Sequence, residues 1–549
     1  MKNKILTGTL VLLAMVAISI GPQSVVASTQ TLGTEAVAPQ QVVNGTDTVV
    51  QVNHSKIIAI NQLSPGFMLD EEWKGYVNTG VRRELAQEAD FKLIRIFDWK
   101  SSSPQPCSSW NETAGSGECD WTTIDRLVQN ILDIGAEPLF CLGASGSNGP
   151  RIPSGMAINP TTNLPYPKSF AAYATEWVRH FKAQGLPVRF YEIWNEPWTY
   201  FGWEPVNRTK LANYEQLFNA VAASMRRENS KVLISFDFIV DKPVLDYWLA
   251  NKGANVDYLD LHKYDSDFVA QSNSSEIFRL AESQYFGTWP LGYSIGDARR
   301  VWHNARGKVL PVIISEGNLD SAWDSGTDPR IQQMVGAVWT ALVLRLAAIN
   351  GVSYNVYYSF SSSASWGSTN TQTGGAGFGM INADDNKPWY PYYVQYLFGK
   401  SLSVGDSLLD SSSSSDDVRT LAWNHAGVLN VLLISTDDQP RIVHLQGANG
   451  KATLVRIDGT IPWTNPALQN GTVNADEPLR MNGYTVALLM MGSSNLLLSK
   501  SVGISVVQLN SEASISLGFA NQLPSVAEIY LRELNAATTF PTIRYSPAS

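Results

Sequence analysis

The sequence predicts an α/β fold in which a (β/α)8 TIM barrel is followed by an antiparallel β-sandwich domain. Within residues 46–402, short apolar runs typical of strands alternate with stretches whose apolar residues recur every three and four positions. Within residues 403–491 the helical pattern disappears, and short strands of alternating polarity lie between turn residues. A chain of 549 residues also exceeds one typical hydrophobic core, so at least two units are expected.

The N-terminus has the three parts of a secretory signal peptide. A basic start, MKNK, precedes the apolar run ILTGTLVLLAMVAISI, and small residues follow up to Ala27. We expect residues 1–27 to be removed and the protein to be secreted, either free or associated with the cell surface. A retained membrane anchor is the alternative, because the run is near the lower limit for spanning. Residues 28–45 are expected to be a flexible lead-in.

The barrel strands are expected at eight apolar runs, each followed by a helical pattern. These runs are KIIAI (56–60), KLIRIF (92–97), EPLFCLG (137–143), RFYEIW (189–194), KVLISF (231–236), YLDLHKY (258–264), VLPVIIS (309–315) and VSYNVYYSF (352–360). A doubly wound open sheet is the alternative architecture. It is disfavoured because no glycine-rich dinucleotide or phosphate loop opens any of the helices.

The second domain is expected to begin after a last barrel helix in KPWYPYYVQYLFGKSL. Strands such as VLNVLLIST and KATLVRIDG predict the sandwich, and LLDSSSSSDD (408–417) is expected to be a surface loop. The strand-like DTVVQVNH, before the barrel, is a candidate for the same sandwich, so the first strand can be shared between the domains. Residues 492–549 contain further short strands, which either extend the sandwich or form a separate piece.

The three cysteines indicate a disulfide and no metal site. Cys107 and Cys119 flank a short polar loop that a disulfide can close in an oxidising compartment. Cys141 lies in a strand pattern and is expected to be a buried, small hydrophobic residue. No Cys/His set has zinc spacing, so neither a metal nor another cofactor is expected.

The charge and the aromatic content of the chain argue against a nucleic-acid partner and favour a carbohydrate. Charged residues make up 16% of the chain and the formal net charge is −9, which argues against nucleic acid because no basic stripe is present to neutralise phosphates. The chain also contains 17 Trp and 21 Tyr. Several tryptophans lie in predicted loops, where a flat apolar ring suits the face of a sugar; capping of the core is the other interpretation. They are Trp99, Trp110, Trp198, Trp203 and Trp366.

Chemically useful side chains gather at the predicted carboxyl ends of the barrel strands, where functional groups of such barrels belong. Arg95 follows the second predicted strand, and Asn195 and Glu196 follow the fourth. His262 and Tyr264 end the sixth strand, and Glu316 ends the seventh.

Two facing carboxyl groups can cleave a glycosidic bond: one protonates the leaving oxygen, and the other attacks the anomeric carbon or activates water. Arg95 beside one glutamate would keep it ionised. Tyr264 can donate a hydrogen bond to the same carboxylate, and Asn195 can bind a sugar 2-hydroxyl group. Four tryptophans are expected to bind sugar rings, namely Trp198, Trp203, Trp99 and Trp366.

The motifs YEIWNEP and, further along, IISEGN resemble those of the clan A retaining glycoside hydrolases. LHKY resembles the His-x-Tyr of strand six in family 5 cellulases, and the combination with a following β-sandwich looks most like family 39, which holds β-xylosidases. The resemblance covers about residues 46–490. It implies that Glu196 is the acid/base, that Glu316 is the nucleophile, and that Asn195, Arg95, His262 and Tyr264 support them. Gly317 is a departure, since related enzymes often place a larger residue there.

We therefore expect a monomer-capable, retaining β-glycoside hydrolase that cleaves a β-linked polysaccharide or oligosaccharide, preferably as an endo-β-glucanase or xylanase. An exo-acting β-xylosidase, β-glucosidase or β-glucuronidase is the alternative. A carbohydrate-binding or surface protein without turnover is the alternative from another class, and the presence of both glutamates argues against it. Glu192 is the main competing carboxylate, but it lies deeper in the strand than Glu196.

Overall fold

The computed structural model describes residues 47–492 except 71–72, 99–104, 147–148, 252, 267–272, 288–291, 322–327, 363–376 and 463. The described residues belong to one compact unit. The predicted signal peptide, lead-in and strands after residue 492 lie outside the described residues, as do Trp99 and Trp366. None of the described helices is long and apolar enough to cross a membrane.

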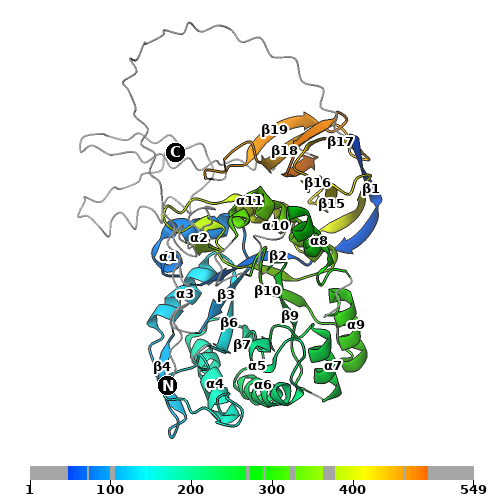
Figure 1. Ribbon diagram of the computed structural model, residues 1–549. Helices are drawn as coiled ribbons and strands as arrows, with labels where there is room; N and C mark the ends of the chain where they lie inside the picture. The colour runs from blue at the N-terminus through cyan, green and yellow to red at the C-terminus, as the bar shows by residue number, and fades with distance from the viewer. Residues whose placement is uncertain are drawn as a thin grey trace, which may run out of the picture. The chain divides into compact units, whose positions relative to one another are not determined.

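The barrel consists of eight parallel strands in the order β8-β7-β6-β3-β2-β11-β10-β9, which confirms the predicted (β/α)8 architecture (Figure 1). The strands are β2 (Ser64–Leu69), β3 (Leu93–Phe97), β6 (Glu137–Ala144), β7 (Phe190–Asn195), β8 (Leu233–Ser235), β9 (Leu259–Tyr264), β10 (Val312–Asn318) and β11 (Tyr354–Tyr357). The two end strands, β8 and β9, are connected by single hydrogen bonds instead of a ladder. Ser235 Oγ donates to the carbonyl oxygen of Tyr258 over 2.7 Å.

The helices that surround the barrel follow the predicted amphipathic pattern. In α3 the buried residues are Ile124, Leu127, Val128 and Ile131, the spacing of one helical face. The other helices are α1 (Trp73–Asn78), α2 (Gly80–Glu88), α4 (Pro167–Gln184), α5 (Trp198–Phe201), α6 (Arg208–Glu228), α7 (Lys242–Ala250), α8 (Ser274–Ser283), α9 (Ile295–Arg306), α10 (Met334–Ile349) and α11 (Tyr390–Ser401); α3 spans Thr122–Asp133, and η2 (Pro329–Gln332) is a short 3-10 helix.

The first barrel strand is not the predicted one. Residues 56–60 end β1 (Asp47–Ile60), which pairs with β14 of the C-terminal domain, so the expectation that they start the barrel was wrong. Their apolar side chains are largely exposed, with Ile57 at 56%. The true first strand, β2, has the sequence SPGFML, and its Ser, Pro and Gly conceal it from a pattern based on strand propensity. Gly66 is needed there, because a Cβ would collide with the carbonyl oxygen of Leu93 in the neighbouring strand.

The C-terminal domain is a single nine-stranded sheet in the order β19-β18-β21-β16-β15-β14-β1-β17-β20. All neighbours are antiparallel except β1 and β17, which confirms the predicted antiparallel domain and the contribution of DTVVQVNH. The sheet curls around one apolar core. The prediction of a surface loop at 408–417 was wrong in part, because residues 408–413 belong to strand β14. The strands are β14 (Ser407–Ser413), β15 (Val418–His425), β16 (Val428–Ser435), β17 (Pro440–Gln446), β18 (Lys451–Asp458), β19 (Gln469–Asn474), β20 (Leu479–Asn482) and β21 (Thr485–Met491).

The barrel and the curled sheet are joined by hydrogen bonds from arginines as well as by the chain itself. Arg419 of β15 donates two hydrogen bonds to the Glu282 carboxylate of α8, over 2.6 and 2.7 Å. Arg345 of α10 donates to the carbonyl oxygen of Thr420 over 2.7 Å. These contacts fix α8 and α10, which cover one side of the barrel, against the second domain.

A disulfide closes the hairpin formed by β4 (Cys107–Asn111) and β5 (Ser116–Cys119), two short strands in the loop after β3. Cys107 and Cys119 are bonded, as the sequence predicts. Cys141 is a free, buried cysteine in β6, also as predicted.

A substitution at Gly399 tests the packing of α11. A Cβ at this position would collide with the carbonyl oxygen of Ala89, so we expect Gly399→Ala to lower the free energy of unfolding by about 1–3 kcal/mol. Gly296→Ala is the control, because Gly296 is also helical and has open space around its Cβ position. Denaturant unfolding should show a loss only for Gly399→Ala, since the control gains helix propensity without a collision. Equal stabilities would contradict the packing described here.

Candidate active site

The centre of the site is the guanidinium group of Arg95, which is fully buried in β3. Its Nε donates to Glu192 Oε2 over 2.7 Å, and its Nη1 donates to Glu316 Oε2 over 2.6 Å. Its Nη2 donates to Asn195 Oδ1 over 2.8 Å. Burial alone would lower the pKa of Arg95, but the two carboxylates raise it well above its usual value. Arg95 is therefore a permanent cation that joins β3, β7 and β10.

Glu316 lies in β10 with both carboxylate oxygens occupied. Arg95 binds Oε2, and the Tyr264 hydroxyl donates to Oε1 over 2.6 Å. Burial and the nearby Glu316 carboxylate raise the pKa of Tyr264 well above its usual value, so Tyr264 remains protonated and acts as the donor. Two donors to one carboxylate fix its orientation.

Glu196 follows β7 in a backbone conformation that is rare for a residue with a side chain. Its φ is +48°, and Trp194 has a φ of +77°. In a regular strand, Glu192 and Asn195 would point to opposite faces, yet both contact Arg95. The positive φ at Trp194 shows that the regular alternation of side chains is interrupted there. This interruption lets Glu192 and Asn195 both contact Arg95. It brings Asn195 beside Glu192, and Glu196 follows at the open end.

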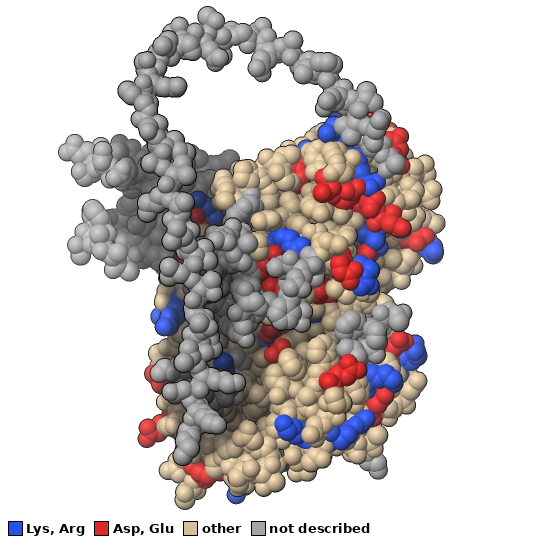
Figure 2. Space-filling view, in the orientation of Figure 1, with Lys and Arg blue, Asp and Glu red and all other residues tan. Residues whose placement is uncertain are grey.

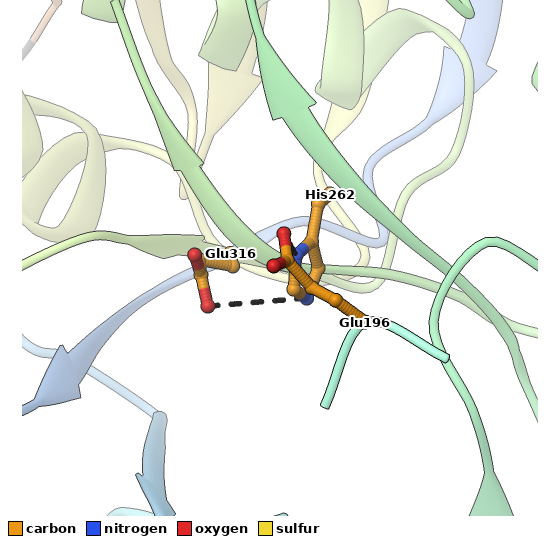
Figure 3. Close-up of side chains that lie close together, drawn as sticks. All are labelled: Glu196, His262 and Glu316. Carbon is orange, nitrogen blue, oxygen red and sulfur yellow. Dashed lines mark hydrogen bonds and ion pairs between the residues drawn. The ribbon is translucent and has the colours of Figure 1, made fainter. Parts of the chain in front are cut away.

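The imidazole of His262 in β9 lies between the two glutamates (Figure 3). Its Nδ1 is 3.3 Å from Glu196 Oε1, and its Nε2 is 3.9 Å from Glu316 Oε2. One carboxylate oxygen of each glutamate and one ring nitrogen all lie within 4.8 Å of one another. The two glutamates are therefore close neighbours, as in retaining glycoside cleavage, where the two carboxyl groups lie about 5–5.5 Å apart.

His262 is surrounded by acceptors. Asp237, which follows β8, places Oδ2 at 3.0 Å from His262 Nε2. Burial would lower the pKa of His262, but the negative charges of Glu316 and Asp237 and the contact with Glu196 raise it to about 9. The ring is therefore an imidazolium at neutral pH.

Glu196, His262 and Glu316 also have the donor atoms of a metal site. A histidine must lose its proton to bind a metal through the nitrogen that carries it. The raised pKa of His262 opposes that loss, and Arg95 and Tyr264 already occupy both oxygens of Glu316. Hydrogen bonding among protein groups thus fits this cluster better than metal ligation.

A cavity of about 230 Å³ opens beside Glu196. Trp198, Trp203 and Phe238 form one wall, with the two indole ring centroids 6.0 Å apart and Phe238 6.0 Å from Trp198. His262 and Tyr264 also line it, which connects the aromatic wall to the carboxyl groups. Two of the four predicted sugar-binding tryptophans thus lie at the site, and Trp99 and Trp366 lie outside the described residues.

Sequence reasoning missed two acidic residues of the site. Glu192, treated as a competitor of Glu196, is fully buried and pairs with Arg95. Burial would raise its pKa, but Arg95 and His262 lower it, whereas burial and Glu192 raise the pKa of the adjacent Asp260 well above its usual value. Glu192 is thus the ionised partner of Arg95 beneath the site.

Asp237 is the second acidic residue that was missed. It lies beyond β8, and reading the carboxyl end of that strand as closely as the others would have found it. Neither Asp98 nor Asp260 is among the described hydrogen-bond partners of Arg95. Asp98 instead accepts hydrogen bonds from Gly143 N and the Tyr173 hydroxyl.

Lys and Arg side chains are interspersed with Asp and Glu on the face of the described residues shown in Figure 2. No continuous basic stripe crosses this face.

Comparisons with known proteins identify the fold. A β-xylosidase from Caulobacter crescentus CB15 is 16% identical, with a TM-score of 0.52 over 80% of this chain and 99% of that one. A GH39 enzyme from Xanthomonas axonopodis pv. citri is 16% identical, with a TM-score of 0.54 over 83% and 99%. CelM2, a bifunctional glucanase-xylanase from a metagenome library, is 13% identical, with a TM-score of 0.52 over 82% and 100%. No protein-family model and no curated protein matches the sequence. The chain has the fold of the clan A retaining glycoside hydrolases, as the sequence resemblance predicts.

Removing the Arg95 charge should destabilise the barrel. In Arg95→Met the buried Glu192 carboxylate loses its partner, so the free energy of unfolding should fall by about 3–5 kcal/mol. Adding Glu192→Gln to Arg95→Met should recover part of the loss, because the fully buried Glu192 charge is then removed, while Glu316 keeps the hydrogen bond from Tyr264. Denaturant unfolding at neutral pH measures both variants. A double variant no more stable than Arg95→Met would contradict the assignment of Glu192 as the ionised partner.

The raised pKa of His262 predicts a pH-dependent contribution to stability. The group titrates near 6.5 when unfolded and at about 9 when folded, so its stabilising effect is complete below about pH 6.5 and is lost as pH rises through 9. The difference in unfolding free energy between the wild type and His262→Asn should therefore shrink between pH 6.5 and pH 9.5. A difference that stays constant over this range would show that His262 is not held as a cation.

Proposed function

We propose that this protein is a retaining β-glycoside hydrolase in which Glu316 is the nucleophile and Glu196 the acid/base. The observation that carries the proposal is the pair of glutamates at the ends of β7 and β10, with oxygens within 4.8 Å of each other and unequal surroundings. Glu316 is buried and held by two donors, whereas the Glu196 side chain is 27% exposed and borders the cavity. A fixed anion beside a more accessible proton donor is the arrangement that double displacement requires.

The reaction proceeds in two steps. A Glu316 oxygen attacks the anomeric carbon while the glycosidic bond breaks, and the departing oxygen takes the proton of Glu196. Glu196 then removes a proton from water, which attacks the anomeric carbon and releases Glu316, so the configuration is retained. The Asn195 Oδ1 faces Arg95, which leaves its Nδ2 to donate to a sugar hydroxyl group.

We propose a β-glucan or xylan as the substrate, cleaved internally. The leaving sugar must lie on the side of Glu196, because its oxygen receives the proton of that residue. That side carries the cavity with Trp198 and Trp203, and aromatic rings of this kind suit the apolar face of a sugar. An aromatic wall for the leaving group favours a substrate that continues as a sugar chain. Exo-acting β-xylosidase activity is the second candidate, supported by the fold shared with the β-xylosidase from Caulobacter crescentus CB15.

We also propose that the enzyme is secreted. The basic, apolar and small-residue segments of the N-terminus support export. The Cys107–Cys119 disulfide supports an oxidising compartment, since such bonds are rare in the cytosol.

Substitution of each glutamate tests the assignment of roles. Glu196→Gln should lower kcat on unactivated substrates by about 10²–10⁴-fold, because general-acid assistance is lost. Glu316→Gln should abolish turnover and labelling by a 2-fluoro glycoside, which otherwise traps the glycosyl ester on Glu316. Glu215→Gln, which removes a buried carboxylate of α6, is the control and should retain full activity. Unchanged hydrolysis by Glu196→Gln would refute the proposal.

The stereochemistry of the first product tests the mechanism separately. Proton NMR during hydrolysis of an aryl β-glycoside should detect the β-anomer first, followed by slow mutarotation. Early appearance of the α-anomer would exclude double displacement. Screening β-glucans, xylans and aryl β-glycosides with the wild type identifies the sugar; release of only terminal residues from polymers would select the exo-acting candidate.

A further inference from the structure

Asp237 connects the backbone and the side chain of the proposed acid/base. It is fully buried beyond the end of β8, and its Oδ2 accepts a hydrogen bond from Glu196 N over 2.8 Å. The same oxygen lies 3.0 Å from His262 Nε2, and the opposite ring nitrogen lies 3.3 Å from Glu196 Oε1. Asp237 therefore contacts Glu196 in two ways: directly at the backbone amide of Glu196, and indirectly through the His262 ring, which contacts the Glu196 carboxyl group.

The first route concerns the backbone. Glu196 has a φ of +48°, which costs free energy for a residue with a Cβ and persists only where its surroundings enforce it. The hydrogen bond from its amide to the buried Asp237 carboxyl oxygen supplies such enforcement, because the partly buried amide would otherwise lose its acceptor at a cost in free energy.

The second route concerns the imidazole. A carboxylate at one ring nitrogen fixes the orientation of a histidine and the group that its other nitrogen faces. Here Asp237 faces Nε2, so Nδ1 faces Glu196. The other charged groups that surround Asp237 and His262 come from β3, β7 and β10, and they are Arg95, Glu192, Glu196 and Glu316.

We propose that Asp237 is a positioning residue for the reaction, which acts through the Glu196 amide and the His262 imidazolium to aim the Glu196 carboxyl group at the leaving oxygen. The inference rests on the proposed function, since it assigns Glu196 the role of proton donor. Asp237 itself is fully buried, is not among the residues that line the cavity, and needs no contact with the sugar.

Asp237→Asn tests this role with two aryl β-glycosides that carry the sugar preferred by the wild type. The 2,4-dinitrophenyl glycoside departs without protonation, whereas the phenyl glycoside needs the proton of Glu196. If Asp237 positions Glu196, kcat/KM for the phenyl glycoside should fall at least about tenfold more than kcat/KM for the dinitrophenyl glycoside. Equal losses on the two substrates would overturn the proposal.

Asp98→Asn is the matched control. Asp98 is also a buried carboxylate at the end of a barrel strand, and it accepts a hydrogen bond from a backbone amide, Gly143 N, over 3.0 Å. It has no described hydrogen bond to Glu196 or His262. The control should lose stability without a change in the ratio of the two kcat/KM values. A change in this ratio as large as that of Asp237→Asn would overturn the specific role of Asp237.

NMR titration of the His262 ring separates failure of this inference from failure of the proposed function. In the wild type its pKa is raised to about 9, and the loss of the Asp237 charge should lower the midpoint in Asp237→Asn. This measurement needs no turnover, so it applies even if the wild type hydrolyses no β-glycoside, a result that would refute the proposed function alone. An unchanged midpoint would overturn the link between Asp237 and His262.

Asp237→Glu provides the second variant if Asp237→Asn does not fold. It keeps the charge but displaces the carboxylate, so the loss should again be larger for the phenyl glycoside. Equal losses on both substrates would overturn the positioning role.

Discussion

The site depends on the burial of one cation. The Arg95 guanidinium is out of contact with water, and such a charge is tolerated only when acceptors of opposite charge surround it. Glu192 and Glu316 supply these charges from β7 and β10, and Asn195 supplies a further oxygen. Because the acceptors come from separate strands, the register of the barrel and the orientation of Glu316 are determined by the same group.

The ends of the strands then give the two glutamates different environments. Glu316 is fixed by Arg95 and Tyr264, which leave it little freedom to rotate. Glu196 is placed by its backbone, through a left-handed φ and a hydrogen bond to Asp237, while its side chain remains partly exposed. Two identical carboxyl groups thereby become suited to different tasks, which is the general means by which carboxyl pairs divide nucleophilic and acid/base roles.

Most of this site could be predicted because strand ends follow from hydrophobic pattern alone. Glu196 directly follows an apolar run and Glu316 lies near the end of another, and the barrel brings those ends together. The sequence predicts that Arg95 follows its strand, but Arg95 lies in the middle of β3. The partner of Arg95 could not be predicted in this way, since the contact with Glu192 depends on the register between strands and on the interrupted alternation at Trp194. The first barrel strand escaped prediction because close packing at Gly66 outweighs strand propensity there, while the apolar KIIAI is exposed in the other domain.

Glu192, although it lies beneath the site, determines the charge that a substrate would meet. Arg95 carries one positive charge and contacts two carboxylates, so the three groups together retain a net negative charge. Without Glu192, the charge of Arg95 would be balanced by Glu316 alone, and less negative charge would face a sugar that develops positive charge at its anomeric carbon. Burial and Glu192 raise the pKa of the neighbouring Asp260, whereas Arg95 and His262 lower the pKa of Glu192, so Glu192 is the member of this pair that is favoured as the anion. The deeper carboxylate therefore keeps Arg95 available for orientation while leaving Glu316 anionic.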